Sequence, residues 1–268
     1  MPSARFSNVL LDPDASPVVG HRGAAAHAPE NTLQSFERAL AGGADALEFD
    51  VHVTADGTPV VHHDATVDRT TGGTGPIATM SLNAVRALDA GARFTADGGR
   101  SYPFRGQGVR VPTLEEVLGA FPAVPMIVEV KTPRASAAVR AVLERHGAAG
   151  RCIIDAFDHA SLAPFRDSPF ALGATRRDVA WLLAATLAGM RVWRTPYRAL
   201  CVPPRYRGIA LPLGRFARVL RPLGATVHVW TIDEPARARA LWAAGVQGVI
   251  TNDPTAMVRA RGRAAAAW

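Results

Sequence analysis

Three acidic side chains interrupt segments that are otherwise apolar. Glu48 and Asp50 lie two residues apart in the run 46–53, and Glu129 lies in the run 126–131. Side chains at a spacing of two point to the same face of a strand, where two carboxylates repel each other unless a cation lies between them. Carboxylate oxygens suit a hard cation such as Mg²⁺ or Ca²⁺. We therefore predict a divalent-metal site at Glu48, Asp50 and Glu129; the alternative is a set of exposed acids paired with Arg or Lys.

Two histidines lie near these acids in the expected fold. His21 and His63 each close a short apolar run, at the position where a strand would end. Imidazole titrates near neutral pH, so it can both accept and release a proton. We interpret His21 and His63 as candidates for a general acid and a general base.

Other polar side chains occur in the same zone. Arg22 and Lys131 could hold a phosphate, Arg through a bidentate fork and Lys as a point charge, or could instead be structural partners of the acids. His52 shares strand parity with Glu48 and Asp50, and we interpret it as an interior neighbour rather than a further ligand. His62 should point opposite to His63, as a surface or core histidine.

The elements that must position these residues alternate between β and α. Such alternation implies a parallel sheet, and eight units in about 250 residues favour a closed (β/α)₈ barrel, whose reacting groups lie at the C-terminal ends of the strands. The sequence contains neither a GxGxxG motif nor a Walker motif, which counts against a nucleotide-binding sheet. We expect strands over 17–21, 46–53, 126–131, 151–157, 170–175, 200–203, 226–232 and 248–251, a further extended segment over 58–63, and helices over 32–41, 135–146, 178–187, 213–220 and 234–244.

The segment 64–112 breaks this alternation. It is rich in glycine and contains one helical pattern, over 81–90. We interpret the chain as a single domain, 1–268, in which 64–112 is an insertion over one face, after the second strand. The alternation resumes at Thr113, which with Glu116 predicts a capping box at the start of a helix.

Composition is that of an ordinary globular enzyme. The chain has 268 residues, of which 48% are hydrophobic, and a formal net charge of +7. A basic field could steer an anionic phosphodiester, but the Arg residues are scattered, which favours a compositional bias, and no motif points to nucleic acid. Cys152 and Cys201 are expected to be buried thiols.

Targeting signals are not apparent. The apolar run in the N-terminal segment 1–17 is too short to be the core of a signal peptide. The longest apolar stretch, 179–190, is shorter than a membrane span and is interpreted as a buried helix. We expect a cytoplasmic protein without stable membrane insertion.

At these residues the sequence resembles the glycerophosphodiester phosphodiesterase family of bacterial type. The resemblance covers most of the chain in the family's order, and the combination of motifs is far more specific than any one of them. The motifs are His21-Arg22-Gly23, Pro29-Glu30-Asn31-Thr32, Glu48-Phe49-Asp50-Val51, His62-His63-Asp64, Pro112-Thr113-Leu114-Glu115-Glu116, Val128-Glu129-Val130-Lys131, Val229-Trp230-Thr231 and the segment 245–254.

The resemblance implies an activity and a role for each site residue. The activity is metal-dependent hydrolysis of a small glycerophosphodiester to glycerol 3-phosphate and an alcohol. His21 and His63 would be the acid/base pair, and Glu48, Asp50 and Glu129 would hold the metal. Substrate contacts would come from Arg22 and Lys131 at the phosphate and from Trp230, an apolar wall for the glycerol or alcohol moiety. Glu30 and Asn31 would support the first loop, and the insertion would shape the substrate pocket.

The sequence also departs from the family pattern. The segment Asp155-Ala156-Phe157-Asp158 lacks the serine expected before the Phe, and Gln247 and Asn252 stand where an acid is more usual. We expect these positions to lie away from the metal and histidine set. Two other functions stay open: a phospholipase D-type barrel acting on lysophospholipids or sphingomyelin, which would need an apolar groove or membrane-facing patch, and a non-catalytic barrel that binds phosphodiesters.

Overall fold

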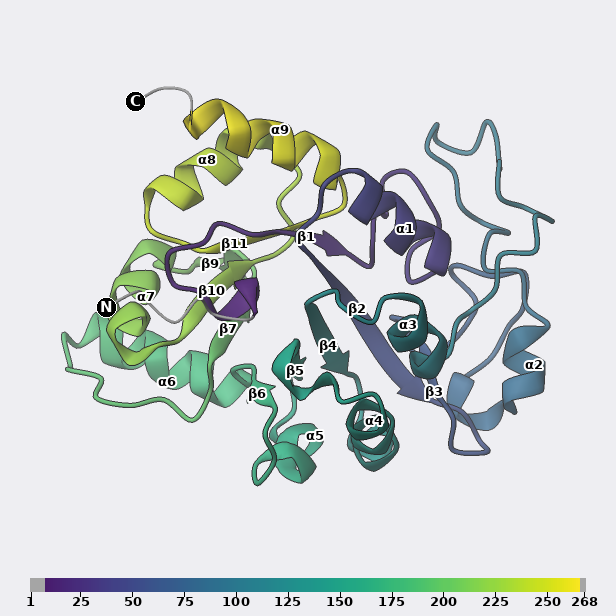
Figure 1. Cartoon of the computed structure of the whole chain (residues 1–268), viewed down its shortest axis with the longest axis horizontal. Helices are drawn as coiled ribbons and strands as arrows, with labels where there is room; N and C mark the ends of the chain where they lie inside the picture. The colour runs from purple at the N-terminus through teal and green to yellow at the C-terminus, as the bar shows by residue number, and fades with distance from the viewer. Residues whose placement is uncertain (1–7, 266–268) are drawn as a thin grey trace.

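The computed structural model describes residues 8–265, so the predicted domain boundaries at 1 and 268 and part of the N-terminal segment lie outside the described residues. Eight parallel strands form a nearly closed barrel with helices around it (Figure 1). This arrangement confirms the predicted (β/α)₈ fold. The strands are β1 (Val18–His21), β2 (Ala46–Val53), β4 (Met126–Val130), β5 (Cys152–Asp155), β6 (Ala171–Leu172), β7 (Ala199–Val202), β10 (Thr226–Val229) and β11 (Gly248–Thr251).

Neighbouring strands follow the order of the chain, and β11 pairs with β1. The weakest seam lies between β6 and β7, where a single parallel bridge joins Gly173 to Ala199. β6 is only two residues long, shorter than the predicted 170–175: beyond it only the Gly173 bridge continues the pairing before the next helix begins at Arg176. A ninth strand, β3 (Pro59–Val61), pairs antiparallel with β2.

Helices cover the outside of the barrel. They are α1 (Leu33–Ala41), α3 (Leu114–Ala120), α4 (Pro133–Arg145), α5 (His159–Leu162), α6 (Arg176–Leu187), α7 (Leu213–Leu220), α8 (Pro235–Ala243) and α9 (Pro254–Ala265), and α2 (Leu82–Arg86) lies in the segment 64–112. The capping box at Thr113 and Glu116 is confirmed: the Thr113 hydroxyl accepts a bond from the Glu116 N–H, and the Glu116 carboxylate accepts one from the Thr113 N–H. α9 was not among the expected helices.

The barrel strands alternate between two environments. Outward side chains such as Phe49 and Val128 pack beneath the helices in a core that includes Phe36. Inward side chains at the start of the strands form a smaller apolar layer closed by Leu10, with Val19, Ile127, Ile153 and Ile250 among its members. The next inward positions, toward the C-terminal ends, are polar. A rigid apolar floor therefore supports a polar layer at the mouth of the barrel.

The segment 64–112 builds a small apolar cluster of its own, which includes Val67, Ile77 and Val85. Its helix α2 is shorter than the predicted 81–90. Beyond Arg86 the chain turns so that the Ala90 N–H donates to the Val109 carbonyl, a bond that a continued helix would not allow.

Two further segments differ from expectation. The stretch 179–190 is not a buried helix: Trp181 is 51% exposed and Leu187 is 68% exposed, because only one side of α6 faces the barrel. After β7 the chain forms an unpredicted hairpin of β8 (Arg205–Tyr206) and β9 (Ile209–Ala210). Cys152 and Cys201 are free and buried, as expected. Among residues 8–265, no helix combines the length and the hydropathy needed to cross a membrane.

Candidate active site

The structure brings the three predicted metal ligands together at the mouth of the barrel. Glu48 and Asp50 point inward from β2, and the register of β2 with β4 sets Asp50 beside Glu129. One carboxylate oxygen from each residue lies within 4.8 Å of the other two. Glu48 and Asp50 are buried and Glu129 is half-buried. Three oxygen donors gathered in this way have the chemistry of a site for a hard divalent cation.

Both predicted phosphate-binding cations are paired with these acids. The Lys131 ammonium lies 3.0 Å from Asp50 Oδ1 and 2.9 Å from Glu129 Oε1, and Arg22 Nε lies 3.3 Å from Asp50 Oδ2. Burial opposes the charge of Asp50, but Lys131 and Arg22 outweigh it and lower the pKa of Asp50 to about 2. Asp50 is therefore a carboxylate at every pH at which an enzyme of this kind would work.

The two glutamates behave differently from Asp50. Burial, followed by repulsion from Asp50 and then Glu129, raises the pKa of Glu48. Burial and repulsion from Asp50 also raise the pKa of Glu129. A nearby cation would favour the ionised form of both glutamates, because it offsets the repulsion between the carboxylates that raises their pKa.

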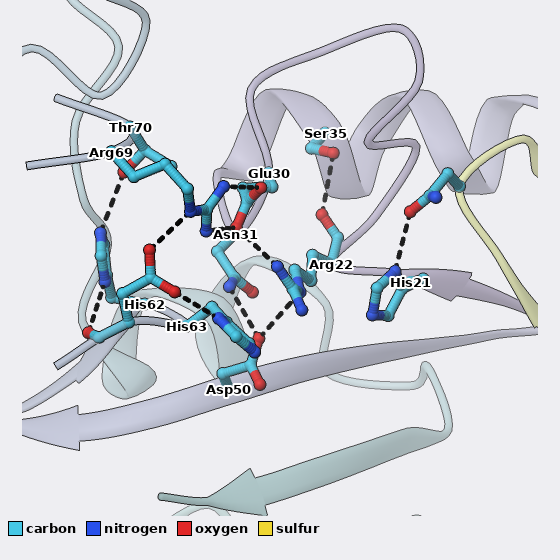
Figure 2. A network of polar contacts seen from close by, with 12 residues as sticks. His21, Arg22, Glu30, Asn31, Ser35, Asp50, His62, His63, Arg69 and Thr70 are labelled. Carbon is cyan, nitrogen blue, oxygen red and sulfur yellow. Dashed lines mark hydrogen bonds and ion pairs between the residues drawn. The ribbon is translucent and has the colours of Figure 1, made fainter. Parts of the chain in front are cut away.

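The loop after β1 is shaped to serve the acid cluster. Arg22 adopts a left-handed backbone with φ of 50°, and its N–H donates to the Glu48 carbonyl at 2.9 Å. Gly23 follows with φ of 89°, and a Cβ there would lie 2.4 Å from Ser35 Oγ, so only glycine fits. Asn31 donates through Nδ2 to Asp50 Oδ2 at 3.0 Å. Arg22 and Asn31 converge on Asp50 in Figure 2.

His21 is held by a chain of polar contacts from the far end of the sequence. The Asn252 amide donates through Nδ2 to Asp233 Oδ2, so its Oδ1 faces His21 and accepts the Nδ1–H at 2.8 Å. This arrangement leaves Nε2 of His21 as the free ring nitrogen. Burial, then the charge of Arg22, lowers the pKa of His21. His21 is therefore held as a neutral imidazole with a free basic nitrogen.

His63 has a carboxylate partner instead. Its Nδ1 lies 2.6 Å from Asp64 Oδ1, and Arg69 Nε donates to the other oxygen of Asp64 at 2.5 Å. Arg69 also binds Glu30 through two nitrogens at 2.8 and 2.6 Å, and Glu30 accepts a bond from Arg22 (Figure 2). This network fixes the His63 ring and links it to the loop after β1.

The other two histidines are structural. His52 is buried and bonds through Nε2 to the His63 carbonyl at 3.1 Å, which is consistent with an interior neighbour rather than a metal ligand. His62 is buried, with bonds to the Asp64 carbonyl and to Thr70 Oγ1. Burial lowers the pKa of both histidines.

A pocket opens above the acid cluster. His21, His63, Glu48, Asp50 and Glu129 line it together with Trp230, and Phe157 completes the aromatic wall with ring centroids 6.1 Å apart. Asp155 and Cys201, both buried, line the same pocket. Every residue predicted as a site residue from the sequence except Lys131 lines this pocket, and Lys131 is ion-paired to two of its lining acids.

Two of the family departures do not lie away from the site. Asn252 contacts His21 directly, and Ala156, at the position of the missing serine, lies between Asp155 and Phe157, which both line the pocket. The expectation fails because positions distant in sequence meet when the barrel closes. Gln247 does lie apart: its side chain bonds the Val227 N–H and the Gly245 carbonyl.

Comparison with known proteins agrees with this geometry. Residues 21–256 match the glycerophosphoryl diester phosphodiesterase family. The chain is 31% identical to a glycerophosphodiester phosphodiesterase of Bacillus subtilis, over 94% of this chain and 88% of that protein. It is also 31% identical to one of Caldanaerobacter subterraneus, over 90% and 96% of the two chains.

Solved structures with the same fold include a glycerophosphoryl diester phosphodiesterase domain of an uncharacterized protein from Mycobacterium tuberculosis. Its TM-score is 0.80 at 22% identity, over 93% of this chain and all of that one. A phosphodiesterase from Oleispira antarctica, solved in complex with the product sn-glycerol-3-phosphate, has a TM-score of 0.71 at 24% identity, over 92% and 97% of the two chains.

Proposed function

Because the chain belongs to the glycerophosphoryl diester phosphodiesterase family, we propose that it hydrolyses small glycerophosphodiesters to glycerol 3-phosphate and an alcohol. The observation that carries the proposal is the meeting of two differently partnered histidines with three carboxylates and two cations in one pocket. The complex of the Oleispira antarctica phosphodiesterase with sn-glycerol-3-phosphate supports the same product.

Glu48, Asp50 and Glu129 would hold one divalent ion, Mg²⁺ or Ca²⁺. The formal charges support this: three carboxylates against Arg22 and Lys131 leave one negative charge, and a divalent ion together with a phosphodiester monoanion brings the total to zero. When bound, such an ion supplies charge neutralisation to the phosphoryl oxygens. The raised pKa values of Glu48 and Glu129 fit residues that need a cation to ionise fully.

The hydrogen-bond partners of the two histidines suggest which is the general base and which is the general acid. His21 donates its Nδ1–H to a neutral amide and keeps Nε2 free, so it is suited to take a proton from the attacking oxygen, from water or from the neighbouring glycerol hydroxyl. His63 is held through Nδ1 by the Asp64 carboxylate, which Arg69 holds in turn, so its Nε2 is oriented toward the pocket side and is suited to protonate the leaving alcohol.

The remaining groups bind and orient the substrate. Arg22 lies between Asp50 and Glu30 with a mostly buried guanidinium that lines the pocket, where it can reach a phosphate oxygen. Lys131 keeps Asp50 charged, pairs with Glu129 and adds positive potential to the phosphate site. Trp230 would form an apolar wall for the glycerol or alcohol moiety. The segment 64–112 would act as an insertion of the single domain, since its Arg69 orients Asp64 behind His63.

A turnover assay tests this function. Glycerophosphocholine is incubated with the protein and either Mg²⁺ or Ca²⁺, and both glycerol 3-phosphate and choline are measured. We expect equal amounts of the two products, with turnover stopped by chelator and reduced at least 100-fold in Glu129→Gln. The exposed Glu234→Gln is the matched control and should leave turnover unchanged. Absence of both products from a folded, metal-loaded protein would exclude the proposal.

A further inference from the structure

The positive charge of the protein comes from one continuous segment. Residues 179–232 contain eight arginines and no aspartate or glutamate, although the whole chain has 30 basic and 23 acidic residues. The remaining residues therefore have a formal charge of −1, and the net charge of +7 lies entirely in this segment. A bias toward arginine over the whole chain would not remove every acid from one long stretch, so the charge distribution calls for a local explanation.

This segment builds one end of the molecule. It includes most of α6, the loop after α6, the β8–β9 hairpin and α7, and Figure 1 shows α6, this loop and α7 at the end opposite α2. Among residues 8–265, only Arg221 of the eight arginines has a carboxylate partner, Asp14. All eight arginines are exposed: Arg191, Arg194, Arg198, Arg205, Arg207, Arg215, Arg218 and Arg221.

The same segment holds most of the exposed large apolar side chains. Seven such side chains are exposed among the described residues, and only Tyr102 lies outside the segment. The densest group is in the run 187–194, where Leu187 is 68% exposed, Met190 is 58% exposed and Trp193 is 70% exposed. Water does not solvate such a group favourably, so a cluster of this kind indicates a contact surface.

The combination of cations with these apolar side chains fits an anionic lipid surface. The guanidinium of Arg191 lies 3.8 Å from the centre of the Trp193 ring, so charge and apolar surface are presented side by side. Tryptophan is favoured at the level of lipid head groups, and arginine can keep its guanidinium among the lipid phosphates while its stem lies deeper. A nucleic acid would use the arginines but not Leu187 or Met190, and a second copy of the chain would bring like charges together.

We propose that this end of the molecule adsorbs reversibly to an anionic lipid surface. Leu187, Met190 and Trp193 enter the head-group region, and the arginines around them contact lipid phosphates. The inference goes beyond the proposed hydrolysis and does not depend on it, because none of these residues lines the catalytic pocket.

Sedimentation with sucrose-loaded vesicles tests the surface. The wild type is mixed with vesicles of phosphatidylcholine alone and with vesicles of equal parts phosphatidylcholine and phosphatidylglycerol. Trp193→Ser removes an apolar side chain, and the double variant Arg191→Gln with Arg194→Gln removes two cations, all at exposed positions.

The matched controls make the same kinds of change in the segment 64–112. They are Tyr102→Ser, at the exposed apolar side chain outside the basic segment, and the double variant Arg100→Gln with Arg110→Gln, at two exposed cations. Circular dichroism and glycerophosphocholine turnover are measured on every variant, and both should match the wild type because all of these side chains are exposed and lie outside the catalytic pocket.

We expect the wild type to bind the mixed vesicles at least about tenfold more tightly than phosphatidylcholine alone. One cation near an anionic surface strengthens binding by about fivefold, so loss of Arg191 and Arg194 should weaken binding to mixed vesicles by about 25-fold at low salt. Trp193→Ser should weaken it by about tenfold, and the controls should stay within about twofold of the wild type.

Three results would overturn the proposal: equal binding to the two kinds of vesicle, equal losses in the variants and their controls, or binding that Trp193→Ser leaves unchanged. Binding of a DNA duplex without binding of vesicles would assign the arginines to nucleic acid and would overturn it as well. Failure of the proposed function shows separately, as absence of glycerophosphocholine turnover by the wild type, while vesicle binding stays measurable.

Discussion

Asp155 carries an energetic cost that a single substitution should remove. The side chain is 8% exposed inside the barrel, and its Oδ1 has no hydrogen-bond partner among the described residues. Burial, followed by repulsion from Glu129, raises the pKa of Asp155 to about 8 from 3.8. Because the folded state holds this proton more tightly than the unfolded chain does, its contribution to stability falls as pH rises from about 3.8 through about 8.

The magnitude follows from these two pKa values. Keeping the carboxyl protonated at pH 7, relative to an unfolded chain that titrates at 3.8, costs about 4 kcal/mol at 1.36 kcal/mol per pH unit. The same cost at pH 5 is about 2 kcal/mol. Asp155→Asn keeps the shape and removes the titration, so its stability advantage over the wild type should grow by about 3 kcal/mol between pH 5 and pH 7, at 1.36 kcal/mol for each of the two pH units.

Urea unfolding in chelator at the two pH values measures this difference. The exposed Asp167→Asn is the control and should show the same stability difference from wild type at both pH values. The reasoning would be refuted if Asp155→Asn were no more stable than the wild type at pH 7, or if its advantage did not depend on pH.

Three other changes have expected outcomes. Asn31→Gly removes the bond to Asp50, tolerates the positive φ of 58° at this position, and should lower metal affinity 10- to 100-fold in a calorimetric titration, with the circular dichroism spectrum unchanged; unchanged affinity would show that Asn31 does not orient Asp50. Gly23→Ala introduces a Cβ against Ser35 at a positive φ and should destabilise the fold by about 2 kcal/mol or more, seen as a lower Tm. Phe36→Ala empties a fully buried position and should cost about 3–5 kcal/mol in urea unfolding, and a cost below about 1 kcal/mol would contradict its place in the core.

The sequence could predict the acid cluster because strand geometry is local. The spacing of Glu48 and Asp50 determines that they share a face, and parallel pairing of consecutive strands brings Glu129 beside them. The eight barrel strands were predictable for a similar reason, since the alternation of apolar runs with helical patterns recurs along the chain. The family resemblance then gave each residue an expected role.

What could not be predicted depends on closure of the barrel and on solvent exposure. The bond between His21 and Asn252 joins residues 231 apart in sequence, and no local pattern encodes it. The solvent-exposed face of α6 could not be predicted either, because an apolar sequence does not show whether other elements cover one side of a helix or both. The first error hides a partner of His21, and the second hides the exposed apolar side chains of α6.

The roles of the two histidines are tested most directly with two substrates that differ only in leaving group. Glycerophosphocholine needs its alcohol protonated, whereas the p-nitrophenyl ester of glycerol 3-phosphate releases a stable anion. With Mg²⁺ or Ca²⁺ present, we expect His21→Ala to lose about 10²- to 10⁴-fold in kcat/KM on both substrates. His63→Ala should lose as much on glycerophosphocholine and little on the p-nitrophenyl ester. If both variants kept wild-type turnover of glycerophosphocholine, or if chelator left the wild type active, metal-assisted catalysis by this histidine pair would be contradicted.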